Sequence, residues 1–231
     1  MQKKLPALFL AVLLAASFAG CAGNKESTEA SASEKNDVQG VEAILNEKAE
    51  QYKDHEDPVA VIVMDSGDCI VMELYKDVAP QTVKNFISLA NKGFYDGLTF
   101  HRIDPTFMIQ GGDPEGNGSG GPGYEIFGEF SNNGFRNDLS HERGVVSMAR
   151  RGSQTNPEQM YNTAGSQFFI CVKDSTFLDG DYAAFGRVLE GMETVDEIAN
   201  AEGAGPRGET PVNPRVMQLV RVTQGGVTVK D

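Results

Sequence analysis

Cysteine is scarce in this sequence of 231 residues, and its three cysteines, Cys21, Cys69 and Cys171, lie far apart. No CxxC pair is present, which excludes a zinc-finger framework, a thioredoxin-like site and a small disulfide-stapled domain. Basic residues are also few: 20 Lys and Arg stand against 33 Asp and Glu, a net charge of −13. Phosphate backbones repel such a chain, so the composition argues against binding to nucleic acid.

Histidine occurs only at positions 55, 101 and 141, without an HExxH motif or any paired-ligand spacing. We therefore expect no bound metal ion. His101, between Phe100 and Arg102, is expected to be a hydrogen-bonded structural residue. Cys69 and Cys171 fall in strand-like runs, where buried inert thiols are the commoner case, although a disulfide between them stays open.

Two further motifs are incomplete. Residues 118–123 match GxGxxG, but the match contains Pro122 and a β-like stretch follows it, where a dinucleotide site requires the start of a helix. Ser166 lies between Gly165 and Gln167 and lacks the second glycine of a serine-hydrolase elbow. These patterns argue against nucleotide binding and against serine hydrolysis.

The chain has one uncharged apolar run near its beginning, Leu5 to Ala19, which is shorter than a membrane span and typical of a secretory signal. Residues 17–21, Ser-Phe-Ala-Gly-Cys, resemble the lipobox of bacterial lipoproteins, in which the cysteine, here Cys21, is acylated. We predict that residues 1–20 are a lipoprotein signal peptide and that the protein lies outside the cytoplasm, anchored to the cell membrane by lipid. An uncleaved membrane anchor and an ordinary cleaved signal are the alternatives.

Residues 22–57 contain ten acidic residues and four lysines, and cannot bury enough apolar area to fold alone. We predict a lipid-anchored acidic tether over residues 21–57. Apolar residues recur within it at helical spacing, which indicates a short amphipathic helix near residues 39–53. This helix either packs on the following domain or frays as a linker.

The remaining residues, 58–231, read as one domain. Apolar runs at 59–64 and 69–74 flank a turn that contains Gly67, which is typical of a β-hairpin. A helix is expected from Pro80 to about Lys92, and a second around residues 192–199. The other apolar runs are 98–103, 107–110, 145–149, 168–172, 183–189 and 216–222. Many short strands and two helices favour a closed or strongly curled antiparallel sheet.

Residues 100–113 place a cation (Arg102), a large apolar side chain (Phe107) and an amide (Gln110) within nine positions. In a strand–turn–strand context the three side chains can share one face. A buried core tolerates arginine poorly unless it is paired or faces a ligand, so the segment is a candidate site, or else Arg102 belongs to a structural salt bridge.

Four motifs carry a family resemblance: FHRIDPTFMIQGGD (100–113), GVVSMA (144–149), GSQFFI (165–170) and FLDGDYAAFG (177–186). They are similar to motifs of cyclophilin-type peptidyl-prolyl isomerases and follow the family order from about Val59 to Val222. The resemblance implies a mainly β fold: a closed eight-stranded antiparallel β-barrel capped by two α-helices, with the active site on its outer face. It implies no cofactor, and proline-containing polypeptides as substrates.

By the same resemblance, Arg102 is the catalytic arginine. An apolar floor for the proline ring is expected from Phe107, Met108, Phe169 and Leu178, and Gln110 is expected to hold the substrate main chain. The full set expected to bind substrate is Phe107, Met108, Gln110, Ala149, Arg150, Gln167, Phe169, Phe177, Leu178 and Tyr182.

The chain departs from the family pattern at three places. Phe177 stands where many eukaryotic members have tryptophan, which removes an indole donor and leaves cyclosporin binding an open question. Tyr182 stands where those members have histidine. Segment 150–163 is longer than in compact members and carries two arginines; it either adjusts the preferred sequence around the proline or is a solvated loop.

The sequence therefore predicts a peptidyl-prolyl cis-trans isomerase that assists the folding of exported proteins at the outer face of the membrane. A surface module that only binds proline peptides is the main alternative, and Arg102 argues against it, because a pure binder has no need of a cation at the rotating bond. A solute-binding lipoprotein conflicts with the short chain. The client proteins and the oligomeric state stay open.

Overall fold

The computed structural model describes residues 26–228, with side chains from residue 39 onward. The predicted signal peptide (1–20) and the predicted lipidation site, Cys21, lie outside the described residues. The chain divides into two compact units, one up to Asp37 and one that begins at Val38. The second unit contains the sheet described below. Among the described helices, none is both long and apolar enough to cross a membrane.

Three α-helices and eleven strands are found in the described residues. The helices are α1 (Glu26–Gln51), α2 (Pro80–Asn91) and α3 (Met192–Ala199). Short 3₁₀ turns occupy Ser131–Asn133, Pro157–Met160 and Thr176–Leu178. The strands are β1 (Val59–Met64), β2 (Cys69–Leu74), β3 (Phe100–Ile103), β4 (Met108–Gly111), β5 (Val145–Met148), β6 (Phe168–Cys171), β7 (Ala184–Glu190), β8 (Gly203–Ala204), β9 (Thr210–Pro211), β10 (Met217–Gln224) and β11 (Val227–Thr228).

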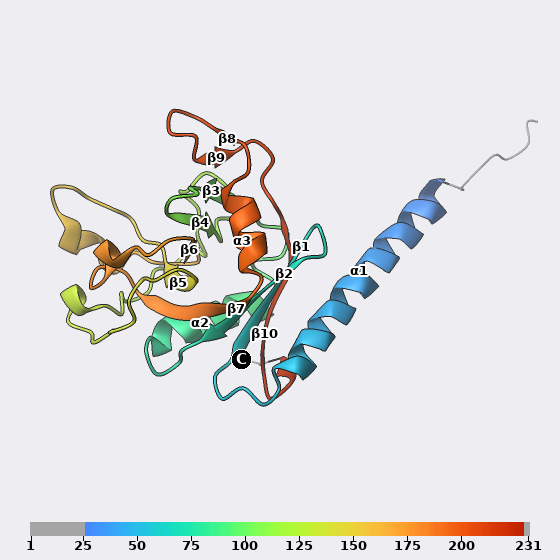
Figure 1. Ribbon diagram of the computed structural model, residues 1–231, viewed down its shortest axis with the longest axis horizontal. Coiled ribbons are helices and arrows are strands. Elements are labelled where there is room, and N and C mark those ends of the chain that lie inside the picture. The colour runs from blue at the N-terminus through green and yellow to red at the C-terminus, as the bar shows by residue number, and fades with distance from the viewer. Residues whose placement is uncertain (1–25, 229–231) are drawn as a thin grey trace, which may run out of the picture. The chain divides into compact units, whose positions relative to one another are not determined.

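Nine strands form one antiparallel sheet in the order β11-β10-β1-β2-β7-β5-β6-β4-β3, which curls around the core (Figure 1). Its two ends approach each other: Met217 N donates to Leu98 O at 2.8 Å, and Phe100 N donates to Arg215 O at 3.2 Å. Within the described part of the chain, one isolated bridge, between Thr99 and Val216, joins them. The mainly β, curled antiparallel fold is thus confirmed. The predicted closed eight-stranded barrel is not, because β3 and β10 are not paired as strands and β11 adds a ninth.

The concave side of the sheet is filled by aromatic and aliphatic side chains. Phe86 of α2 stacks on Tyr95 at 5.1 Å between ring centroids and meets Phe168 edge-on at 5.4 Å. Helix α2 packs on β10, and α3 on β2, β3 and β4. In the view of Figure 1, α2 lies beneath β7 and α3 above it. Both predicted helices of the domain are confirmed, since the Pro80 start and the 192–199 spacing match their bounds.

Strand β1 is buried on both faces. A second element must therefore cover the face that an antiparallel sheet commonly presents to solvent. Ala60 and Ile62 belong to the main core, whereas Val61 and Val63 point to the other side. There they form a second cluster with Val41, which is 7% exposed, and with Ile44 of helix α1. The last part of α1, from Val38 onward, therefore packs on the domain, which decides between the two readings left open for this segment.

Glu190, at the end of β7, holds the same part of α1 in place. Its carboxylate accepts hydrogen bonds from Lys48 at 2.6 Å, from Tyr52 at 2.6 Å and from Gln51. The hydrogen bonds of Lys48 and Tyr52 lower the pKa of Glu190 below its usual range. A charged carboxylate is therefore the form that the folded unit favours.

The two described cysteines are free thiols. Cys69 is half-buried and Cys171 buried, and both are free, so the disulfide considered from the sequence is not formed. Burial raises the pKa of the Cys171 thiol to about 12, which makes it unreactive.

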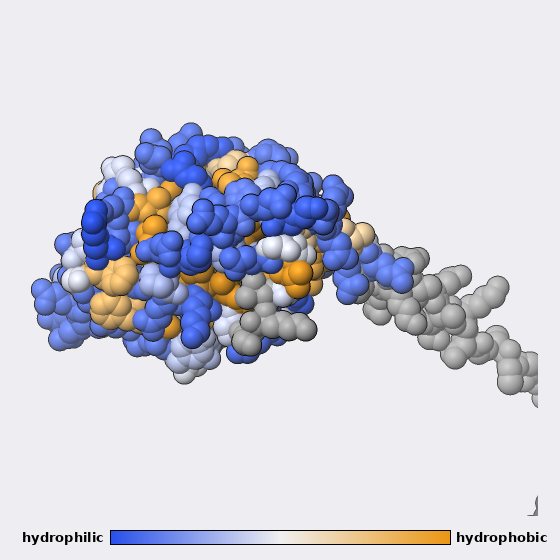
Figure 2. Space-filling model, turned by 90° about the horizontal axis from the view of Figure 1, so that it is seen from below, coloured by the Kyte–Doolittle hydropathy of each residue, from blue (hydrophilic) through white to orange (hydrophobic). Residues whose placement is uncertain are grey.

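On the face seen in Figure 2, hydrophobic areas are small and separated by hydrophilic residues.

We predict that a chain beginning at residue 58 is less stable than one beginning at Val38. Without α1, the side chains of Val61, Val63 and Leu219 face water, and burial of such side chains contributes about 1.5–3 kcal/mol each. Thermal unfolding followed by circular dichroism should show a clearly lower Tm for the shorter chain. Glu42→Ala, an exposed change on the same helix, is the control. Equal Tm values for the two chains would contradict the role assigned to α1.

Candidate active site

The register of four strands places a row of side chains on the outer face of the sheet. Arg102 of β3 pairs with Gln110 of β4, Gln110 pairs with Phe169 of β6, and Phe169 pairs with Ser147 of β5. Residues directly opposite each other share one face, and their chain neighbours point to the other. Ile109 accordingly lies in the main core. The strands therefore bring the cation and the amide of segment 100–113 together, as the sequence predicts.

An apolar cluster lies beside this row, on the face where a sheet normally presents polar side chains to solvent. Its buried members are Met108, Phe169, Cys171 and Leu178, and Phe107, Ala149 and Tyr182 pack against them. Phe177, which is 73% exposed, stands at the edge with its ring 5.5 Å from that of Phe107. Six of the ten residues predicted to bind substrate belong to the cluster, and Phe177 adjoins it.

The guanidinium of Arg102 is held by three groups. Its Nε donates to Oε2 of Glu209 at 3.1 Å, and one terminal nitrogen lies 3.4 Å from Oε1 of Gln110. Its carbon lies 5.9 Å from the centroid of the Phe107 ring, within range of a cation–π contact. A salt bridge of Arg102 was one of the two readings of this segment, but its partner Glu209 could not be foreseen, because 107 residues separate the two in the sequence and no motif links them.

A chain of amides continues from Arg102 across the sheet. Gln110 donates through Nε2 to Oε1 of Gln167 at 2.8 Å. Gln167 in turn donates to the carbonyl oxygens of Gly118 at 3.1 Å and Gly120 at 2.8 Å. Each amide therefore has a fixed orientation, since its donor and acceptor ends are engaged by different partners.

The glycine-rich segment wraps a carboxylate of its own chain rather than a phosphate. Asp113, 1% exposed, accepts hydrogen bonds from the backbone N–H of Glu115 at 2.8 Å and of Gly118 at 2.5 Å. Burial raises the pKa of Asp113, but the backbone donors together lower it further, to below its usual value. A side chain at Gly120 would put its Cβ 2.1 Å from the Asp113 carboxylate, so the glycine is required there.

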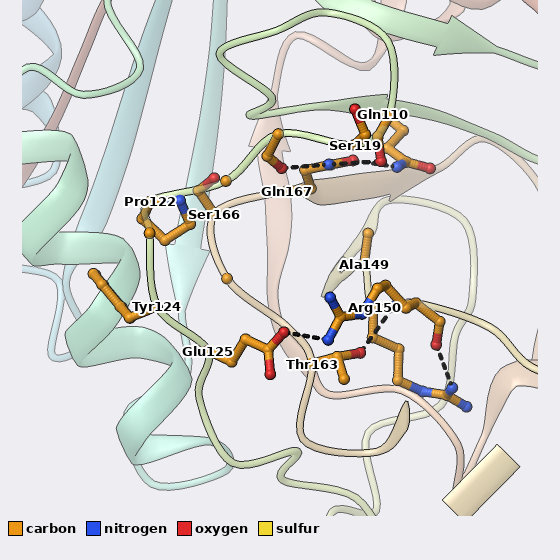
Figure 3. Close-up of a pocket in the computed structure, with 16 residues that line it drawn as sticks. Gln110, Ser119, Pro122, Tyr124, Glu125, Ala149, Arg150, Thr163, Ser166 and Gln167 are labelled. Carbon is orange, nitrogen blue, oxygen red and sulfur yellow. Dashed lines mark hydrogen bonds and ion pairs between the residues drawn. The ribbon is translucent and has the colours of Figure 1, made fainter. Parts of the chain in front are cut away.

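A groove with a volume of about 820 Å³ opens beside the amide chain. Figure 3 shows Gln110, Ser119 and Gln167 together on one side of it, and Glu125, Arg150 and Thr163 on the other. The Arg151 guanidinium pairs with Glu125 across this side. Ala149, Arg150 and Gln167, all predicted to bind substrate, thus line a groove that continues from the apolar cluster through Ala149.

Arg150 is fixed by aromatic rings at the start of segment 150–163. Its guanidinium carbon lies 4.5 Å from the ring centroid of Tyr182, 5.3 Å from that of Tyr161 and 5.6 Å from that of Phe130. Its Nε donates to the carbonyl oxygen of Asp181 at 2.9 Å. The segment is exposed along most of its length, but its first residue, Arg150, packs against the edge of the apolar cluster at Tyr182.

A hydrogen-bond chain that runs from the exposed Asp179 to the buried His141 and Ser147 lies under Phe169 and was missed from the sequence. Nδ1 of His141 is 2.7 Å from Oδ1 of Asp179, and Nε2 is 3.0 Å from Oγ of Ser147. The imidazole is stacked on the Phe169 ring with an interplanar angle of 15°. Serine, histidine and aspartate occur here in the order of a hydrolase triad, but Ser147 is fully buried and cannot reach a substrate. The chain supports the floor of the site.

His101 differs from expectation. It is buried to 8% exposure, yet neither ring nitrogen has a hydrogen-bond partner among the described residues. The prediction of a hydrogen-bonded histidine is wrong at this position. Burial lowers the pKa of His101, so the uncharged imidazole is the form that the site tolerates without a partner.

We predict that acid destabilises the domain through the chain under Phe169. Burial lowers the pKa of His141 from its usual 6.5, more than Asp179 raises it, so stability falls as pH drops from about 6.5 towards the folded pKa. Burial raises the pKa of Asp179, but Ser140 and His141 lower it further, to below 3.8, so additional stability is lost below that pH.

The measurement is Tm between pH 7 and pH 5. His141→Gln, which cannot titrate, should reduce this dependence, and the part that remains is the contribution of His101, whose pKa burial also lowers. His55→Gln, at the half-buried histidine next to Glu73, should leave it in place. An unchanged pH slope in His141→Gln would refute the assignment.

Comparisons with known proteins point to one family. Residues 59–224 match the family described as "Cyclophilin type peptidyl-prolyl cis-trans isomerase/CLD". Peptidyl-prolyl cis-trans isomerase B of Bacillus subtilis is 44% identical over 140 residues, which cover 61% of this chain and 90% of that protein. The peptidyl-prolyl cis-trans isomerase of Helicobacter pylori is 41% identical over 145 residues, covering 62% of this chain and 81% of that one.

Among solved structures, a cyclophilin type peptidyl-prolyl cis-trans isomerase of Cryptosporidium parvum is similar with a TM-score of 0.62 and 29% identity. The match covers 76% of this chain and 99% of that one. A second structure of that protein, in the presence of the dipeptide Ala-Pro, gives a TM-score of 0.60, with 29% identity, 75% of this chain and 99% of that one.

Proposed function

Since the chain belongs to the family of cyclophilin-type peptidyl-prolyl cis-trans isomerases, we propose that the outer face of its sheet is the active site and Arg102 its catalytic residue. The observation that carries this proposal is the row formed by Arg102, Gln110 and Phe169 beside an apolar floor. Proline-containing polypeptides are the substrates, in keeping with the relative whose structure was determined in the presence of Ala-Pro.

The reaction requires no covalent step. Rotation about a peptide C–N bond is opposed by a barrier of about 18–20 kcal/mol, because it breaks amide resonance. In the twisted transition state the proline nitrogen becomes pyramidal, and its lone pair, which is delocalised in the planar amide, becomes localised on the nitrogen. A donor held at that nitrogen, and a pocket that favours the twisted form, lower the barrier. Arg102 is suited to this role because guanidinium is permanently charged and presents several N–H donors in one plane.

The surrounding residues divide the binding between them. Met108, Phe169 and Leu178 form an apolar surface for the pyrrolidine ring, with Phe107 at its side. Gln110, held by Gln167, offers a polar side chain beside Arg102 for the substrate main chain. The groove along Ala149 and Gln167 accommodates residues that precede the proline.

We predict that Arg102→Ala lowers kcat/KM for a short Xaa-Pro peptide by on the order of a hundredfold or more, because the transition state loses its charged donor. Arg102→Lys keeps the charge but not the planar set of donors and should recover only part of the activity. The assay uses the unit that begins at Val38. Thermal unfolding of each variant controls for folding. Full activity in folded Arg102→Ala would exclude Arg102 as the catalytic residue.

The location of the protein is a further part of the proposal. Support comes from the apolar run at residues 5–19, the Ser-Phe-Ala-Gly-Cys sequence ending at Cys21, and the acidic stretch that follows. On this basis the isomerase is a lipoprotein that acts outside the cytoplasm and assists the folding of exported proteins. A peptidyl-prolyl bond exchanges in tens to hundreds of seconds without catalysis, which makes an isomerase useful where exported chains fold.

We predict that Cys21→Ser releases the protein from the membrane fraction of bacterial cells. The full chain should incorporate labelled fatty acid and sediment with membranes, because two or more acyl chains hold a protein firmly on a bilayer. Cys69→Ser, at a cysteine far from the signal, is the matched control. Membrane association that persists in Cys21→Ser would favour an uncleaved anchor, and a soluble exported chain in both would favour an ordinary signal.

A further inference from the structure

The loop between β8 and β9 brings a carboxylate to the catalytic arginine. Glu209 lies directly before β9, and its carbonyl oxygen accepts a hydrogen bond from Ile103 N at 2.8 Å. Ile103 follows Arg102 in β3, so a backbone bond fixes Glu209 beside the strand that carries the arginine. The Glu209 side chain is 18% exposed and that of Arg102 34%. A half-buried pair of this kind is screened less by solvent than a surface ion pair.

The contact between the two side chains has the form of a fork. Oε2 of Glu209 lies 3.1 Å from Nε of Arg102, and Oε1 lies 3.5 Å from one terminal nitrogen. Two acceptors that face two donors of the same rigid plane restrict its rotation as well as its position. The pair thus restrains the plane of the guanidinium through Nε and one terminal nitrogen.

The other contacts of the guanidinium leave part of it available. Of its five N–H donors, Glu209 engages two and Gln110 a third, so two have no partner among residues 26–228 and can meet a substrate. The Phe107 ring lies against the guanidinium, with its centroid 5.9 Å from the guanidinium carbon. Without Glu209 the long Arg102 side chain would keep only the contacts to Gln110 and Phe107, and would sample more rotamers.

We infer that Glu209 is a positioning residue for catalysis: its carboxylate fork holds the Arg102 guanidinium in the orientation from which it reaches the rotating bond. This inference rests on the proposed role of Arg102. This orientation stabilises mainly the transition state, because the lone pair that accepts the hydrogen bond is localised on the proline nitrogen only there. Loss of Glu209 is therefore expected to lower kcat and to leave KM nearly unchanged.

The test is a double-mutant cycle with Glu209→Ala, Arg102→Ala and the double variant. Exchange of an Ala-Pro peptide between its isomers, followed by NMR, measures binding and interconversion separately. Glu209→Ala should lower kcat by on the order of tenfold, with KM within about twofold. In the Arg102→Ala background it should cause no further loss, because there is no guanidinium left to orient.

Two further variants separate orientation from folding. Glu209→Gln keeps one oxygen acceptor for Nε and should recover part of the lost kcat. Arg207→Ala removes a 78% exposed neighbour on the same loop, whose guanidinium lies 3.3 Å from Glu209, and should leave kcat within about twofold. Glu209→Ala and Glu209→Gln should both melt close to the parent protein.

The outcomes distinguish this inference from the proposed function. If Arg102→Ala abolishes activity but Glu209→Ala leaves kcat unchanged, the positioning role is wrong and the site assignment stands. Equal losses from Glu209→Ala in both backgrounds would show a purely structural effect and overturn the inference. High activity in Arg102→Ala would overturn the site assignment, and the inference with it.

Discussion

The double pairing of Gln110 is the constraint on which the site depends. Gln110 lies opposite Arg102 on one side and opposite Phe169 on the other, so three strands must keep one register for cation, amide and apolar floor to meet. A shift of one residue in any of these strands would turn its side chain of the row towards the core. The core resists such a shift, because Ile109 and Phe168 occupy the alternate positions and are fully buried. Packing inside the sheet thus determines chemistry on its outside.

Close backbone approach adds a second constraint at the end of β4. Gly112 has φ of 83°, and a Cβ there would lie 2.4 Å from the carbonyl oxygen of Ser166. This approach lets Gln167 reach both Gln110 and the loop closed by Asp113. The loop is rigid because backbone donors surround its carboxylate, and it therefore gives the amide chain a fixed end. The glycines that match the dinucleotide pattern by chance therefore line the groove beside the amide chain.

Most of the strands could be predicted from the sequence, because alternation and turn residues act locally. The row of site residues followed from the family motifs, and the structure brings those residues together. Glu209 and the Asp179–His141 pair could not be predicted, since each depends on contacts between distant segments. Asp179 lies in one of the family motifs, but no motif includes His141 or Glu209. The prediction of a hydrogen-bonded His101 was wrong for a different reason. A buried polar group usually has a hydrogen-bond partner, but the neutral His101 ring has none among the described residues.

The packing of α1 changes what the acidic segment can do. The sequence favours a spacer over residues 21–57, yet the compact unit begins at Val38, and the apolar run of β1 needs the helix as its cover. Under the proposal that Cys21 is lipidated, residues 22–37 are the part of the chain between the lipid and the unit that begins at Val38. Residues 26–37 are helical, which at 1.5 Å per residue spans about 18 Å, less than half of what an extended chain of that length reaches. A lipid anchor at Cys21 would therefore hold the isomerase closer to the membrane surface than an extended spacer of the same length would.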